Sequence, residues 1–101
     1  MGLKYNPVWA SGRFSTAGAT VSAQECSAAR TGAGRYTVTL DTNIETAQCC
    51  GIQAQSHTTG VIAHAAIPTF GATTTTIAVE TNTDAGVATD AAFSITVLSS
   101  K

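Results

Sequence analysis

The sequence has few charged residues and few of the residue types that build helices. Asp, Glu, Lys and Arg make up 11% of its 101 residues, whereas about a quarter is usual in soluble domains. It contains three leucines, three glutamates and two lysines, so a helical bundle or coiled coil is disfavoured. The basic residues Lys4, Arg13, Arg30 and Arg35 are scattered and form no basic stripe, so we expect no nucleic-acid partner.

Long apolar runs are also missing from the sequence. No run approaches the roughly 18 apolar residues that a membrane-spanning helix needs, so we expect no membrane partner. The first residues, Met1–Asn6, contain no apolar segment of the kind found in a secretion signal. We therefore expect the protein to be made and kept in a cytoplasm.

Small and β-branched residues take the place of the missing types. Thr and Ala supply 18 residues each, and Val and Ile together supply 13. A net charge of −1 with 44% hydrophobic residues disfavours disorder, so a sheet protein is expected. Only 23 residues are large and apolar, which predicts a thin core. We expect a homo-oligomer or a subunit that is completed by a partner surface.

Alternation of polar and apolar residues marks three strands clearly. The pattern runs through residues 35–41, 76–80 and 92–98, and a period of two is typical of a half-buried strand. The inward positions of these strands, with one from a further strand over residues 47–55, form the predicted core. The core residues are Tyr36, Val38, Leu40, Ile52, Ile77, Val79, Phe93, Ile95 and Val97.

Weaker patterns predict the remaining strands, over residues 8–14, 20–29, 47–55 and 61–67. Turn-forming residues at 56–60 predict that the last two form a hairpin, and residues 31–34 form the turn into the strand that begins at Arg35. Seven or eight short strands at this spacing predict an all-β fold, a single antiparallel β-sandwich or jelly roll. We expect residues 1–101 to form one domain, with residues 1–9 as an N-terminal arm.

The residues that could carry chemistry do not form a known catalytic or metal-binding pattern. His57 and His64 are expected in a turn and on a sheet face, and no nucleophile motif accompanies them. Cys26, Cys49 and Cys50 lack the spacing of a zinc site. They are expected to be small buried side chains, the alternative being a disulfide between Cys26 and one of the other two. The sequence predicts no enzyme, no metal and no cofactor.

Three segments resemble a small β-sandwich module of tailed-bacteriophage virions. They are Gly32–Leu40 (GAGRYTVTL), Cys49–Ile52 (CCGI) and Asp90–Leu98 (DAAFSITVL). The first and third are similar to the patterns G-x-G-x-Y-x-V-x-apolar and D-x-x-F-x-V-x-V of that module, and the likeness covers about residues 8–100. The module occurs at the ends of phage fibres and as short free-standing head proteins.

The resemblance, together with the short chain, implies a capsid decoration (cement) protein. Such proteins lie on the exterior of the capsid in the virion, bridge subunits of the major capsid protein and stabilise the shell. They are homo-oligomers, and the resemblance favours a trimer over a dimer. The alternative is a receptor- or glycan-binding tip module of a phage fibre, with its specificity in the loops at residues 42–46 and 82–90.

The N-terminal segment supplies the residues that we expect to contact the capsid. The candidates are Lys4, Tyr5, Pro7, Trp9 and Arg13. Pro7 fixes an extended path, and aromatic residues such as Tyr5 and Trp9 are common anchors of interfaces. The alternative for Trp9 is that it caps the core of the sandwich.

Overall fold

The computed structural model describes residues 8–41, 49–66 and 68–99. No helix capable of crossing a membrane occurs in this part of the chain. Within these ranges the chain forms nine strands and no helix. They are β1 (Val8–Phe14), β2 (Thr20–Gln24), β3 (Cys26–Gly32), β4 (Arg35–Leu40), β5 (Cys49–Ser56), β6 (Val61–Ala65), β7 (Thr69–Phe70), β8 (Thr75–Thr83) and β9 (Phe93–Ser99).

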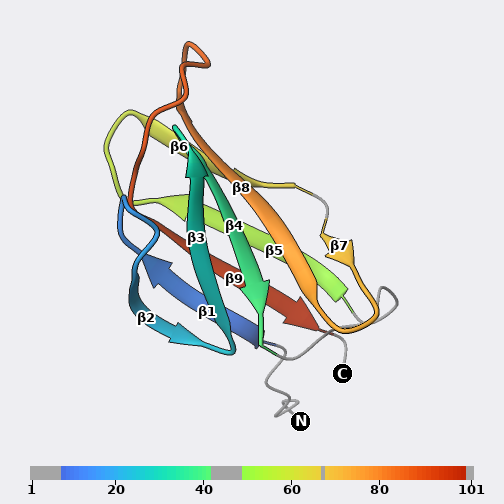
Figure 1. Cartoon of the computed structure of the whole chain (residues 1–101). Coiled ribbons are helices and arrows are strands. Elements are labelled where there is room, and N and C mark those ends of the chain that lie inside the picture. Colours follow the sequence, from blue (N-terminus) through green and yellow to red (C-terminus); the bar gives the residue numbers. More distant parts are fainter. Residues whose placement is uncertain (1–7, 42–48, 67, 100–101) are drawn as a thin grey trace, which may run out of the picture.

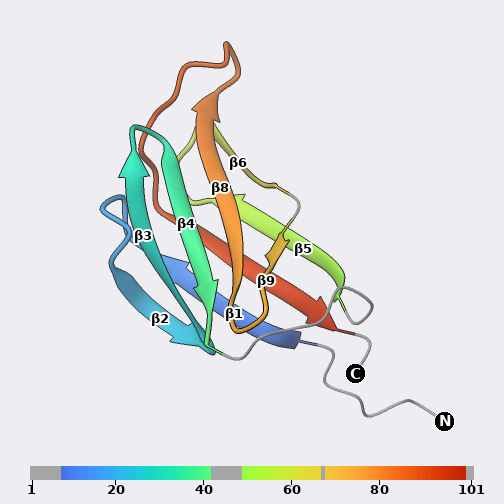
Figure 2. The ribbon, with the colours of Figure 1, turned by 45° about the vertical axis from the view of Figure 1, so that its right-hand side comes forward.

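The strands form two antiparallel sheets that pack face to face (Figure 1). The first sheet has the order β2-β1-β9-β5. The second has the order β3-β4-β8-β6, and the short β7 pairs with β8. Figure 2 shows the two layers from another side, with β9 in the middle of one and β8 in the other. The predicted all-β antiparallel sandwich is confirmed.

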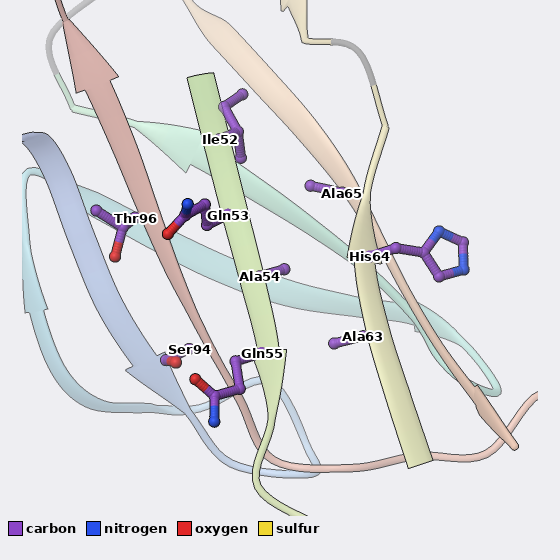
Figure 3. A pocket seen from close by; sticks show the side chains of 9 residues that line it. All are labelled: Ile52, Gln53, Ala54, Gln55, Ala63, His64, Ala65, Ser94 and Thr96. Carbon is purple, nitrogen blue, oxygen red and sulfur yellow. The ribbon is translucent and has the colours of Figure 1, made fainter. Parts of the chain in front are cut away.

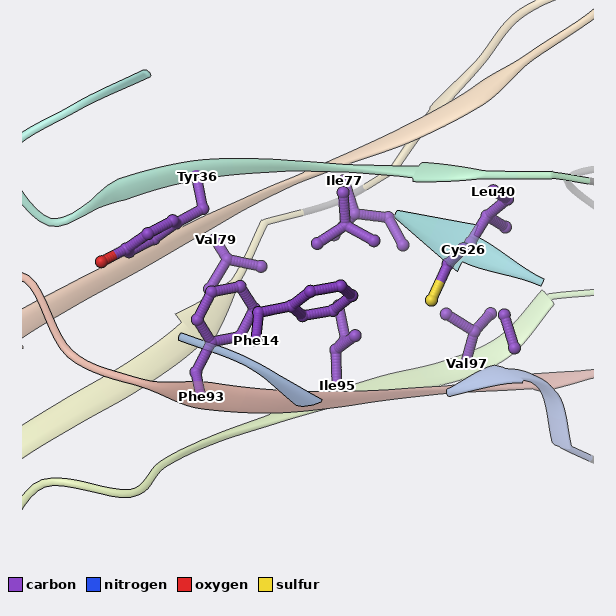
Figure 4. Packing of buried hydrophobic residues seen from close by; sticks show 11 residues of the cluster. Phe14, Cys26, Tyr36, Leu40, Ile77, Val79, Phe93, Ile95 and Val97 are labelled. Atoms are coloured by element: carbon purple, nitrogen blue, oxygen red, sulfur yellow. The ribbon is translucent and has the colours of Figure 1, made fainter. Parts of the chain in front are cut away.

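The core lies between the sheets and is built from alternate residues of the central strands. Eight of the nine predicted core residues, all but Ile52, are at most 2% exposed. Phe93 is at the centre of an aromatic group. Its ring centroid lies 4.8 Å from that of Tyr36 and 5.4 Å from that of Phe14. Figure 4 shows these rings between the two layers. Because side chains alternate across a strand, the same residues that predicted the strands also fill the core.

Ile52 is the exception among the predicted core residues. It is half-buried and packs against the margin of the core, because β5 is the outermost strand of its sheet. Phe14, which is fully buried, was not among the predicted core residues. Its strand lacks a clear apolar alternation, since Ala10 and Gly12 stand at the other inward positions.

The predicted strand over residues 20–29 is interrupted at Glu25. This residue has a φ of 65°, a left-handed conformation that is uncommon for a residue other than glycine. β2 and β3 on its two sides belong to different sheets, so the prediction of one strand is wrong. The backbone oxygen of Glu25 accepts a hydrogen bond of 2.8 Å from the amide of Asp41, which ties this corner to the end of β4.

The predicted hairpin of residues 47–55 and 61–67 is also wrong. Residues 56–60 do turn the chain, but β5 pairs with β9 and β6 pairs with β8. The turn therefore carries the chain from one sheet to the other. Turn chemistry indicates where a chain reverses, and it does not determine which strand each arm will pair with.

The predicted turn at residues 31–34 is found between β3 and β4, but it is shorter, since Thr31 and Gly32 belong to β3 and only Ala33 and Gly34 form the turn. Gly34 has a φ of 63°, and a Cβ at this position would overlap the backbone oxygen of Thr81. The amide of Thr81 in turn donates a 2.8 Å hydrogen bond to the oxygen of Gly34. Glycine is required here both for the left-handed conformation and for the close approach of β8.

Candidate functional site

The outer face of the first sheet carries two rows of polar side chains, which we call the polar face. Inward positions of these strands are apolar, so the alternate residues point away from the core. The registers of β2, β1, β9 and β5 place these residues side by side across the sheet. The first row is Gln24, Ser11, Thr96 and Gln53, and the second row is Ser22, Arg13, Ser94 and Gln55.

The polar face is hollowed on both sides of β9. A groove of about 550 Å³ extends from β9 over β5 towards β6, and a second hollow of about 320 Å³ lies over β1 and β2. Ser94 and Thr96 line both of them. Figure 3 shows Gln53 and Gln55 on the same side of β5 as these two β9 residues. The polar face thus contributes hydroxyl and amide groups to both hollows, and Ile52, Ala54, Ala63 and Ala65 add an apolar lining to the first one.

Arg13 is the only charged residue in the two rows. It is exposed, and it makes no ion pair with another residue of the described ranges, whereas Arg30 binds Asp90 at 2.8 Å. A guanidinium in an otherwise neutral field can form two parallel hydrogen bonds with a carboxylate. The polar face thus suits a partner surface that offers an acidic side chain among neutral polar groups.

The candidate partner-binding residues do not lie together on one surface of the described structure. Lys4, Tyr5 and Pro7 lie outside the described residues. Trp9 is half-buried and packs against the core, as the core-capping alternative expects, and it lies where the β1–β9 register shifts. Val8 and Trp9 belong to β1, so an arm over residues 1–9 would overlap the first strand by two residues. Arg13 lies on the polar face.

A second polar cluster links the β3–β4 turn to the segment before β9. The carboxylate of Asp90 accepts hydrogen bonds from the Arg30 guanidinium at 2.8 Å and from the Gly34 amide at 2.7 Å. These contacts lower the pKa of Asp90 below its ordinary value. Next to it, the hydroxyl of Tyr36 donates to the oxygen of Thr16 at 2.8 Å. The cluster links the β3–β4 turn to the segment before β9.

We expect Asp90→Asn to lower stability in a pH-dependent way. At neutral pH the variant loses the charged contact with Arg30 and should unfold at a lower urea concentration. A carboxyl whose pKa is lowered by folding stabilises the protein above its unfolded pKa, about 4, and this contribution is lost as the pH falls through the folded pKa. The difference in stability between the two proteins should therefore shrink as the pH falls below about 4. Asp84→Asn, in the exposed β8–β9 loop, is the control and should differ little from the parent at neutral or acidic pH.

The histidines and cysteines do not assemble a reactive centre in the described residues. On the outer face of the second sheet, Nε2 of His64 in β6 lies 3.8 Å from Oε1 of Glu80 and 3.5 Å from Nδ2 of Asn82. His57 lies in the β5–β6 turn. Cys26 is a buried free thiol, and burial raises its pKa to about 11, so it is a neutral side chain at physiological pH. Pairing of Cys49 or Cys50 lies outside the described side chains. No group of three metal-binding side chains occurs in the described ranges.

Sequence reasoning found Arg13 but not the polar face around it. The rows depend on which strand is next to which, and the β1–β9 and β5–β9 neighbours are far apart in the sequence. The local signal is a pair of polar residues at alternate positions in each strand, namely Ser11 and Arg13 in β1, Gln53 and Gln55 in β5, and Ser94 and Thr96 in β9. No family model matches the chain, and no curated protein or solved structure matches it significantly.

Proposed function

We propose that this chain is a structural protein that decorates the exterior of a tailed-phage capsid and stabilises it by bridging subunits of the major capsid protein. The proposal rests on the resemblance of three segments and on the polar face. In the fold the resembling segments form β4 with the turn before it, the start of β5, and β9 with the three residues before it. They are thus main elements of the two sheets.

The observation that carries the proposal is the polar face with its lone cation, Arg13. Seven neutral hydroxyl or amide side chains surround that charge, and neutral groups lose less hydration free energy than ions when a partner covers them. A broad, shallow face of this kind suits another protein surface. A protein that binds across two capsid subunits binds only their assembled state, so its binding shifts the equilibrium between assembled and separated subunits towards assembly.

The test uses virions from cells that carry this gene. The chain should be present in a fixed ratio to the major capsid protein, and virions that lack it should lose their DNA at a lower temperature. Arg13→Ala should weaken binding to undecorated shells by about tenfold, the loss expected for one charge-assisted contact. The matched control is Arg35→Ala on the outer face of the other sheet. Virions without the chain, or equal binding by both variants, would contradict the proposal.

A receptor- or glycan-binding tip module is the second candidate. The specific observation in its favour is that hydroxyl and amide groups of the polar face can both donate and accept hydrogen bonds with sugar hydroxyls. Glycan sites usually add an aromatic side chain, and none of the eight residues in the rows is aromatic. Binding to a glycan array that Gln53→Ala abolishes, without any binding to shells, would favour this candidate over capsid decoration.

A further inference from the structure

β5 is the longer of the two edge strands of the first sheet, with eight residues against five in β2. β5 pairs with β9 along one side. On its other side lies β6, which belongs to the second sheet, and no ladder joins the two within the described ranges. Figure 3 shows Ala54 of β5 and Ala63 and Ala65 of β6 pointing towards each other, and these residues line the groove with Ile52. Within the described residues, this side of β5 therefore forms no ladder, and a groove of about 550 Å³ lies beside it.

Natural sheets usually protect such an edge with charged residues, proline or a bulge. The eight residues of β5 contain no charged residue and no proline, and the register with β9 is regular from Gly51 to Ser56. Ile52 and Ala54 on its inner side are only half-buried. An added strand would pair with this backbone and cover both side chains.

The sequence of the edge indicates which strand would be added. Gln53-Ala54-Gln55 is a local palindrome, and both glutamines are exposed on the polar face. Two identical strands that pair antiparallel about Ala54 bring Gln53 opposite the partner's Gln55, and Gln55 opposite the partner's Gln53. A primary amide has both donors and an acceptor, so these pairs satisfy each other. The edge is complementary to itself.

We propose that two copies of this chain form a dimer by antiparallel pairing of their β5 strands, with the two-fold axis at Ala54. On the inner side, Ala54 meets the partner's Ala54, and Ile52 lies opposite the partner's Ser56. Ala63 and Ala65 of β6, which line the groove beside this edge, are small side chains. The pairing is isologous, because each copy uses the same patch.

The dimer joins two four-stranded sheets into one sheet of eight strands. The polar faces of the two copies then become continuous across the axis, with one Arg13 on each side. A ring of three copies cannot form in this way, since an isologous contact closes at two. The proposal thus goes beyond capsid decoration and differs from the trimer that the family resemblance implies.

The test compares two double variants that differ only in the sign of one charge. Gln53→Lys with Gln55→Lys places like charges opposite each other twice in the dimer, whereas Gln53→Glu with Gln55→Lys places opposite charges there. Sedimentation velocity over a dilution series should show a dimer for the parent and for the Glu/Lys variant. The Lys/Lys variant should dissociate at a concentration at least about tenfold higher, because cross-strand charge pairs are sensitive to sign.

Circular dichroism and the melting transition of the monomer show that each variant is folded, which is expected since both positions are exposed. A parent protein that sediments as a monomer or a trimer throughout the series overturns the proposal. Equal dimerisation of the two variants overturns it as well. Binding to capsid shells is measured separately, so loss of the dimer and loss of capsid binding are distinguishable outcomes.

Discussion

Ile95→Asp is expected to prevent the chain from folding. Ile95 lies at the centre of β9 and is 1% exposed, with Ala54 and Gly12 as its register partners on the two sides. Burying a carboxylate without a partner costs several kcal/mol or more, which is comparable to the roughly 5–15 kcal/mol of stability of a typical domain. Circular dichroism should show loss of the sheet signal and of a cooperative melting transition.

The adjacent residue provides a matched control for this substitution. Ser94→Asp introduces the same carboxylate one position earlier, on the polar face and opposite Arg13 in the register. It should fold like the parent and melt at a similar temperature. If both variants fold equally well, the assignment of inward and outward faces on β9 is wrong.

Phe93→Ala is expected to destabilise the protein by about 3–5 kcal/mol, the range for truncating a fully buried Phe. The ring of Phe93 contacts both Tyr36 and Phe14, so its removal leaves a cavity at the meeting point of the two sheets. The thin core offers few large side chains that could close around it. Urea denaturation at neutral pH should show a midpoint well below that of the parent.

Two further variants separate the loss of the aromatic group from the loss of any apolar side chain. Phe93→Leu keeps most of the buried volume and should cost less than the alanine variant. Phe70→Ala removes a half-buried ring on the short strand β7, and a smaller loss is expected because that site is open to solvent. Equal losses for Phe93→Ala and Phe70→Ala would contradict the central position of Phe93.

The parts of the fold that depend on local alternation could be predicted from the sequence. β4, β8 and β9 were predicted with the correct inward residues, such as Val38, Ile77 and Ile95, because the side-chain period of a strand is visible in any short window. Local alternation does not determine which strands pair with each other. The split at Glu25 and the separation of β5 from β6 arise from how the sheets pack, which a local pattern does not contain.

The candidate site likewise combines a residue that the local sequence indicates with an arrangement that depends on strand pairing. Arg13 could be named from the sequence as a basic residue near the expected arm, and its place on β1 is now known. The rows around it bring β1, β5 and β9 together from three distant parts of the chain. The self-complementarity of Gln53-Ala54-Gln55 is visible in the sequence, but it has meaning only once β5 is known to be a sheet edge.

The position of β9 has a consequence for how the chain folds. β9 follows the other strands in the sequence, yet it lies between β1 and β5 and is the sole strand that joins them within the described sheet. Until β9 has been synthesised, β5 has no ladder partner and β1 has only β2. Such contacts between distant segments slow folding, because closing a long loop costs entropy before the paired strands contribute favourable free energy. β5 should therefore join β1 and β2 in the first sheet only after β9 has left the ribosome.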